Sequence, residues 1–404
     1  MKRKILYISM CLPFDKAFHA GGKTFNYYIN SFANDDSNEV TLIAKVLPDE
    51  EKYIDTVNKR IKLFTVSAHK SGVKKYLAYA KSINSKFNPL YRYGNTLTYD
   101  IYTQIEKRLR KLEIEGYEPD IVILEWTQML LFIDCVKKNF PRAKYVASEH
   151  DVTFLGKERR YRAAKGIWNK TIRGLSYKNM MSRELTAIDG CDLVVTHNQK
   201  DKKLLLDHGI DIKKLDVIAP YYEPLKSIIP SESARDIVFY GAMNRLENYS
   251  AALWFIDNVM PLLDNIDIRF VVVGNKPPIE LQNRKNERVL VTGFVEDVSV
   301  YFEQAVCLVA PLFLGAGIKV KILEALTAGL VTLTNDIGIE GIGAVDGRDY
   351  IHCNTPDEYS RHIIELKNDI ILRKKISGNA RKLICQNYDL KKSFINYSNK
   401  IYRL

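Results

Sequence analysis

The chain has few cysteines, and none of them is spaced as a metal-binding or redox pair. Its 404 residues contain six, far apart and without a Cys-x-x-Cys motif: Cys11, Cys135, Cys191, Cys307, Cys353 and Cys385. This spacing argues against a zinc finger or a disulfide framework and predicts reduced, mostly buried thiols in a cytoplasmic protein. No apolar run reaches the ~18 residues of a membrane-spanning helix. Internal repeats and low-complexity segments are also lacking, which leaves an ordinary globular protein.

The N-terminal residues are not expected to act as a cleavable signal sequence. The first residues, MKRKILYISMCLPF, combine a basic start with a short apolar run. Pro13 and Asp15 end that run, and no small-residue cleavage site follows. We therefore interpret the segment as a first β-strand.

Positive charge is in excess. The formal net charge is +12, from 60 Lys and Arg against 48 Asp and Glu. Such a surface attracts nucleic acid, an anionic membrane or phosphorylated ligands. The basic residues are spread along the chain, with local concentrations at 107–111, 157–173 and 373–382. Because no nucleic-acid-binding motif is present, nucleic acid is not an expected partner. Ordinary solvated surface and a peripheral membrane contact stay open as interpretations.

Short apolar segments rich in Ile, Val and Tyr alternate with longer segments, in two series. The first series is 4–9, 39–44, 60–67, 120–126, 144–150 and 192–198, and the second is 236–241, 268–274, 288–294, 305–312 and 330–336. This alternation is typical of buried strands in parallel α/β sheets. A proline-containing segment, 217–236, separates the two series. The fold class is therefore α/β with two Rossmann-like domains, 1–224 and 225–385, a division that suits the chain length.

One glycine loop leads into a charged helix. In the segment LGAGIKVKILEAL, Gly315 and Gly317 flank the expected helix start, after the strand at 305–312. Gly317, Lys321 and Glu324 follow i, i+4, i+7 spacing and share a face. Helix N-termini bind phosphate, so we interpret the loop and Lys321 as a diphosphate site and Glu324 as the acceptor for a ribose diol. The alternative is an exposed Lys–Glu pair, worth only ~0.2–0.5 kcal/mol.

The blocks FYGAMNRLENYSAALWFIDNVMPLL, VVVGNKPP and VTGFVEDVSVYFEQAVCLVAPLFLGAGIKVKILEALTAGLVTLTNDIGIEGI together resemble the C-terminal half of a family 4 glycosyltransferase, over 236–385. HAGGKTF and VASEHDVTF resemble the N-terminal half more faintly. The resemblance implies the GT-B fold, in which two Rossmann-like domains face each other across a cleft and a last helix, here 386–404, crosses back onto the first. It implies transfer of a sugar from a nucleotide donor, held mainly by the second domain, to an acceptor held mainly by the first, with retention and without an essential metal.

Site residues follow from the resemblance position by position. Glu324 matches the ribose-binding glutamate, Arg245 the diphosphate-binding arginine, and His150 the histidine that faces the donor sugar, while Lys321 and Lys319 would add charge beside the diphosphate. The remaining donor-binding positions are Gly21, Gly22, Gly241, Asn244, Gly315, Ala316, Gly317, Ile318, Glu340 and Gly341. Of these, Gly21 and Gly22 match the family's loop that approaches the diphosphate from the first domain. Two departures stand out: Ala316 replaces a glutamate common in the family, and the lysine often found after the arginine is missing.

The expected protein is a glycosyltransferase of bacterial surface polysaccharide or glycoconjugate synthesis. It would use no cofactor or metal, would prefer UDP-sugar to GDP-sugar, and would lie in the cytoplasm at the inner face of the membrane. Its acceptor would be a glycan, a lipid-linked sugar or a protein. The alternatives are a GT-B-like epimerase or phosphorylase and an inactive nucleotide-binding partner protein.

Two points about the first domain remain open at this stage. The basic, aromatic segments 71–100 and 157–175 either contact an anionic membrane or a lipid-linked diphosphate, or are solvated helix faces. His150 is either a site residue or a structural histidine. Asp151 beside it is expected to cap a helix rather than to act as a base.

Overall fold

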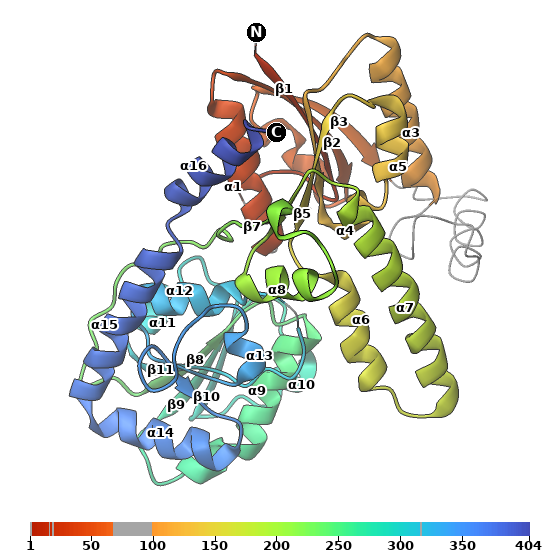
Figure 1. The fold of residues 1–404 in the computed structure, drawn as a ribbon. Helices are drawn as coiled ribbons and strands as arrows, with labels where there is room; N and C mark the ends of the chain where they lie inside the picture. Colours follow the sequence, from red (N-terminus) through yellow and green to blue (C-terminus); the bar gives the residue numbers. More distant parts are fainter. Residues whose placement is uncertain (1, 16, 18–19, 68–98, 316) are drawn as a thin grey trace. The chain divides into compact units, whose positions relative to one another are not determined.

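The computed structural model describes all residues except 1, 16, 18–19, 68–98 and 316. The chain divides into two compact units (Figure 1). Unit 1 comprises Met1–Tyr221 and Leu390–Leu404, and unit 2 comprises Tyr222–Asp389. The first of the two expected basic segments, 71–100, lies almost entirely outside the described residues.

Unit 1 is built on a seven-stranded parallel sheet in the order β3-β2-β1-β4-β5-β6-β7. Strand β1 is central, and its Ile5 pairs with Val40 on one side and Ile121 on the other. Because helices cover both faces, its side chains from Ile5 to Ser9 are all buried. The strands are β1 (Arg3–Ser9), β2 (Asn38–Val46), β3 (Ile61–Ser67), β4 (Ile121–Glu125), β5 (Lys144–Glu149), β6 (Leu193–Thr196) and β7 (Leu215–Val217).

Helices of unit 1 pack on this sheet through apolar stripes. In α1 (Ala20–Asn34), Phe25, Ile29 and Phe32 are buried, and Tyr397 and Ile401 of α16 (Leu390–Ile401) belong to the same core. The other helices are η1 (Glu51–Thr56), α3 (Tyr99–Ile114), α4 (Trp126–Leu130), α5 (Ile133–Asn139), α6 (Thr153–Arg162), α7 (Ile167–Asp189), α8 (Gln199–Asp207) and η3 (Ile212–Lys214).

Unit 2 repeats the architecture with a six-stranded parallel sheet in the order β10-β9-β8-β11-β12-β13. The strands are β8 (Asp236–Tyr240), β9 (Arg269–Val273), β10 (Val289–Gly293), β11 (Ala305–Ala310), β12 (Thr332–Thr334) and β13 (Ile351–His352). The helices are α9 (Leu246–Asn258), η4 (Met260–Leu263), α10 (Ile279–Gln282), α11 (Ser299–Phe302), α12 (Val320–Ala328), α13 (Asp336–Ile339), α14 (Pro356–Asn368) and α15 (Ile370–Asn387).

In each sheet, the direction in which the chain adds new strands reverses at one place. In unit 1 the chain builds outward from β1 to β3 and then resumes on the other side of β1 with β4. In unit 2 the same reversal falls between β8 and β11. Ligands of open α/β sheets bind beyond the carboxyl ends of the strands at such switch points. The two places to search for a site are therefore the β1/β4 and β8/β11 ends.

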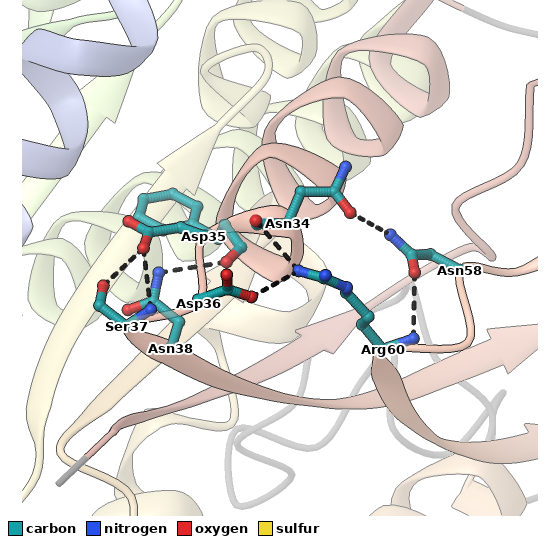
Figure 2. Close-up of polar contacts among 8 residues, drawn as sticks. Asn34, Asp35, Asp36, Ser37, Asn38, Asn58 and Arg60 are labelled. Atoms are coloured by element: carbon teal, nitrogen blue, oxygen red, sulfur yellow. Dashed lines mark hydrogen bonds and ion pairs between the residues drawn. The ribbon is translucent and has the colours of Figure 1, made fainter.

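A polar cluster lies in unit 1 at the amino ends of β2 and β3, away from the switch point (Figure 2). The turn before β2 is joined there to the turn before β3, because Arg60 contacts the Asp36 carboxylate at 2.9 Å and the Asn34 carbonyl at 3.1 Å. Asn58 also donates to the Asn34 side chain at 3.0 Å. These contacts lie at the amino ends of the strands and are exposed, so we interpret them as structural.

Candidate donor site in unit 2 and the matching cluster in unit 1

Beside the β8/β11 switch point of unit 2, the neighbouring strands β8 and β9 end side by side. Gly241 and Gly274 follow these strands, and both have positive φ, near +154° and +155°. A Cβ built on Gly274 would lie 1.8 Å from the Gly241 carbonyl oxygen, so only glycine permits this close approach. Gly241 itself lies against the Asn248 side chain. The backbone after β8 is thereby held next to the first turns of α9.

The glycine loop follows β11, but the helix begins later than expected. α12 starts at Val320, with Lys319 in the N-cap position, so Gly317 precedes the helix and does not lie on one of its faces. The reason is conformational: Gly315 and Gly317 have φ near +125° and +69°, which a right-handed helix cannot contain. Gly317 is buried and Ile318 partly buried, while Ala316 lies outside the described residues.

Lys321 is the partly buried cation of this site. Its Nζ donates to Asn248 Oδ1 at 2.6 Å and lies 4.5 Å from the centroid of the Phe239 ring. Burial, and then the neighbouring charges of Lys319 and Arg245, lower the pKa of Lys321 to about 7. Three cationic side chains therefore converge on one place, and a bound polyanion would relieve their mutual repulsion.

Arg245 and Asn244 lie in the loop between β8 and α9. Arg245 occupies the N-cap position of α9 and contacts Glu247 at 2.5 Å. Its side chain is 59% exposed, in contrast to Lys321. Asn244 is exposed as well. Arg245 can therefore reach a ligand in solvent while it still influences the pKa of Lys321.

Glu324 is held in place by two donors. The Tyr240 hydroxyl donates to its Oε2, and the backbone N–H of Glu223 donates to its Oε1 at 3.3 Å. Burial and the adjacent carboxylate raise the pKa of Tyr240, so the phenol remains a donor. Glu324 is only 9% exposed, which rules out the alternative of a solvated surface pair with Lys321.

Lys319 joins the glycine loop to the loop after β12. Its Nζ donates to the Gly317 carbonyl at 2.5 Å and lies 3.6 Å from the Glu340 carboxylate, and both charged side chains are largely buried. The second loop has its own anchor, since the Tyr388 hydroxyl lies 3.2 Å from the Gly341 carbonyl and 3.0 Å from that of Ile342. The structure thus brings Lys319 and Glu340 together, and their ion pair joins the glycine loop to the loop after β12.

A second cluster lies at the β1/β4 switch point of unit 1 and contains His150. The His150 ring stacks on Trp126 with centroids 4.2 Å apart, and its Nε2 lies 2.9 Å from Glu125 Oε2. A Cβ on Gly21 would lie 3.2 Å from His150 Nδ1 and 3.3 Å from Trp126, so α1 approaches both rings closely. His197 lies behind, with its ring centroid 4.7 Å from that of His150.

Protonation in this cluster is governed by burial. Burial raises the pKa of Glu125 to about 7, although Ser148 and His197 oppose the shift. Burial and then the charge of His150 lower the pKa of His197 to about 3. Among the described residues, His197 Nε2 has no hydrogen-bond partner. The cluster therefore places beside His150 a carboxyl group that titrates near neutral pH and an imidazole that stays neutral.

Two expectations about unit 1 are wrong. Gly21 and Gly22 do not form a loop, because they lie in the first turn of α1. Asp151 does not cap α6: Val152 holds the N-cap position, and the amides of Thr153 and Phe154 donate to Glu184 of α7, both at 2.8 Å. A carboxylate from a distant helix has replaced the local cap.

The sequence interpretation missed several residues of the two clusters, namely Tyr240, Asn248, Glu125, Trp126 and His197. Tyr240 and Glu125 are the last residues of buried strands, the first before a loop and the second directly before α4, a position that could have marked them. Nothing local indicates Asn248, which is drawn into the site by the fold of α9. Within the described part of the chain, no group of His, Cys, Asp and Glu side chains could hold a metal ion. No helix there is both long and apolar enough to cross a bilayer.

Several known proteins are similar to this chain. Residues 234–369 match the family described as "Glycosyl transferases group 1". A protein of the cps region of Klebsiella pneumoniae is 26% identical over 170 residues, which cover 39% of this chain and 44% of that protein. An uncharacterized glycosyltransferase of Methanocaldococcus jannaschii is 23% identical over 305 residues, 69% of this chain and 73% of that protein.

Among solved structures, Anabaena HepE in complex with UDP-glucose superimposes with a TM-score of 0.67 at 13% identity, covering 99% of this chain and 100% of that one. At this identity the likeness shows the fold, which is the GT-B fold of two Rossmann-like domains. The fold class expected from the sequence is confirmed. The resemblance to family 4 glycosyltransferases is also confirmed, by the group 1 match over residues 234–369.

Proposed function

We propose that this protein transfers a sugar from a nucleoside-diphosphate sugar to a glycan, lipid-linked or protein acceptor, with retention of configuration and without a metal. The observation that carries the proposal is the convergence of Arg245, Lys319 and Lys321 on the β8/β11 switch point, beside the positioned carboxylate of Glu324. Cations and a helix N-terminus suit a diphosphate, and a fixed acceptor suits a ribose diol.

The chemistry follows from where charge develops. As the bond from sugar to diphosphate breaks, negative charge grows on the leaving phosphate, and fixed cations stabilise that charge more than the ground state. Removal of one such group costs roughly 2.7–4 kcal/mol in oxyanion sites of comparable design. In a retaining transfer the departing phosphate can accept the acceptor's proton, so a strong base is not required. His150 would contact the donor sugar.

UDP is the proposed nucleotide in preference to GDP. Structures of HepE with UDP and with UDP-glucose support this choice. The relative from a cps region supports a role in surface polysaccharide or glycoconjugate synthesis. We place the reaction in the cytoplasm, at the inner face of the membrane.

Thermal unfolding with a panel of nucleoside diphosphates tests the donor site. A ligand at about 100 times its Kd stabilises the native state by ~2.7 kcal/mol. We expect UDP to raise the Tm of the wild type and to lose most of this effect in Glu324→Ala. Glu324→Gln, which keeps the shape and one acceptor oxygen, should lose less. Arg60→Ala is the control, since this exposed residue lies in unit 1, at the amino end of β3.

Two results would count against the proposal. If no nucleotide shifts the Tm of the wild type, the switch point of unit 2 is not a nucleotide site. If UDP stabilises Glu324→Ala as much as the wild type, Glu324 does not contact the ribose. Slow release of UDP from UDP-sugars without an acceptor would further distinguish a transferase from an inactive nucleotide-binding protein.

A further inference from the structure

The helical hairpin of α6 and α7 has a surface that the proposed reaction does not explain. The two helices are joined by residues 163–166 and form a hairpin (Figure 1). They pack on each other through Tyr161, Tyr177 and Gly174. The rings of Tyr161 and Tyr177 stack with centroids 6.3 Å apart. Glu184 of α7 also caps the first turn of α6. The hairpin is therefore a defined structural element.

Large apolar side chains gather on the outer surface of α7. Trp168 is 84% exposed, Ile172 58% and Leu175 66%, and the neighbouring Ile167 is 84% exposed. Trp168, Ile172 and Leu175 follow i, i+4, i+7 spacing and form one stripe, which lies on the side of α7 opposite to Tyr177. Single exposed apolar residues are common, but a contiguous stripe that includes a tryptophan marks an interaction surface.

The same segment carries a strong positive charge. Residues 157–178 contain eight Lys and Arg against a single acidic residue, Glu158. Glu158 is itself bound by Arg162, at 2.6 Å. Lys165, Lys170 and Arg173 lie in the fully exposed run around Trp168. Basic residues around an exposed aromatic and aliphatic stripe have the composition of a helix that lies in a membrane interface.

We propose that the stripe of Trp168, Ile172 and Leu175, with the surrounding basic residues, docks unit 1 onto an anionic lipid bilayer. The apolar side chains enter the boundary between headgroups and acyl chains, where tryptophan is favoured. The lysines and arginines extend to lipid phosphates, with their methylene stems along the apolar surface. This inference does not depend on the proposed donor site, because all its residues lie on one hairpin of unit 1.

Sedimentation with vesicles tests the docking. We expect the wild type to bind phosphatidylcholine vesicles that contain phosphatidylglycerol, more weakly at high salt, and to bind pure phosphatidylcholine poorly. The triple variant Trp168→Ser, Ile172→Ser, Leu175→Ser should bind at least tenfold more weakly. The matched control is Ile114→Ser with Ile371→Ser, which removes two equally exposed apolar residues from other helices, 78% and 76% exposed.

A charge variant separates the two contributions. Lys165→Gln, Lys170→Gln, Arg173→Gln should lose the preference for phosphatidylglycerol and its salt dependence. The Tm without ligand and the far-UV circular dichroism spectrum serve as the folding check, and we expect both to be close to the wild type in every hairpin variant. Equal vesicle binding by the wild type and the apolar triple variant would overturn the proposal, as would absence of binding to anionic vesicles. Light scattering that shows a dimer dispersed by the triple variant would assign the stripe to a second copy of the chain instead.

Discussion

Protonation of Lys321 should be coupled to donor binding. The pKa of this buried amine is about 7 in the free protein, against 10.5 normally, because of burial and the charges of Lys319 and Arg245. Near neutral pH, about half of the molecules therefore carry an uncharged Lys321. A diphosphate placed against the glycine loop would favour the charged form and draw a proton onto the amine.

The size of the coupling follows from that pKa. An opposite charge within a few Å raises a pKa by roughly one to three units. With a shift of two units, affinity for the donor should fall ~100-fold, equivalent to ~2.7 kcal/mol, as the pH rises from below 7 to above 9. Donor affinity must fall as the pH rises, because the free protein loses the proton at a lower pH than the complex and binding must then take it up again. At pH 8, binding should take up roughly 0.8 proton per donor.

Calorimetric titration with a nucleoside-diphosphate sugar, in buffers of different ionisation enthalpy, measures both the affinity and the proton uptake. Lys321→Arg should bind with little dependence on pH and without uptake, because the guanidinium stays charged. Lys321→Met should bind more weakly at every pH, also without uptake, and Arg60→Ala should behave as the wild type. A wild-type affinity that stays constant between pH 7 and pH 9, with no proton uptake, would refute the reasoning.

Two further predictions concern the residues beneath the sites. Tyr240→Phe removes a hydrogen bond to Glu324, worth about 0.5–1.5 kcal/mol, and should weaken UDP binding about 2- to 10-fold in a titration; an unchanged Kd would show that Glu324 is held without it. For Glu125, burial raises the pKa from 4.5 to about 7, so its contribution to stability is complete below pH 4.5 and is lost as the pH rises through 7. Glu125→Gln should remove this pH dependence, ~3 kcal/mol at most, from urea unfolding measured between pH 5 and pH 7.5, and equal slopes in both proteins would contradict the assignment.

Most of the strands could be anticipated, because buried parallel strands leave apolar runs in the sequence. The six runs of the first series and the five of the second all contain strands. The two strands that were not expected, β7 (Leu215–Val217) and β13 (Ile351–His352), have three and two residues and lie at sheet edges. Elements this short have no measurable periodicity, and tertiary pairing alone defines them.

The site was only partly predictable, for a different reason. The glycine loop and the charges of Lys321 and Glu324 are local signals, and the sequence presents them together. Their partners are not local: Asn248 is 73 residues from Lys321, and Tyr240 is 84 residues from Glu324. The start of α12 was misplaced because helical spacing was extended through glycines whose φ is positive. The cap of α6 was misassigned because Glu184, 31 residues beyond Thr153, takes the place of a neighbouring side chain.

Each switch point holds an ionisable side chain whose pKa burial shifts toward the neutral form, and both shifts bear on stability. At the end of β4, burial raises the pKa of Glu125 from 4.5 to about 7, which costs ~3 kcal/mol of stability at pH 7 relative to acid pH. In unit 2, burial and then the charges of Lys319 and Arg245 lower the pKa of Lys321 from 10.5 to about 7. Folding at pH 7 then displaces about half a proton that the unfolded chain would keep, and the shifted pKa costs on the order of 4 kcal/mol. If stability were the only requirement, a neutral residue at position 321 would avoid this cost. We therefore infer that the position is kept cationic for an anionic ligand, which would return that free energy on binding.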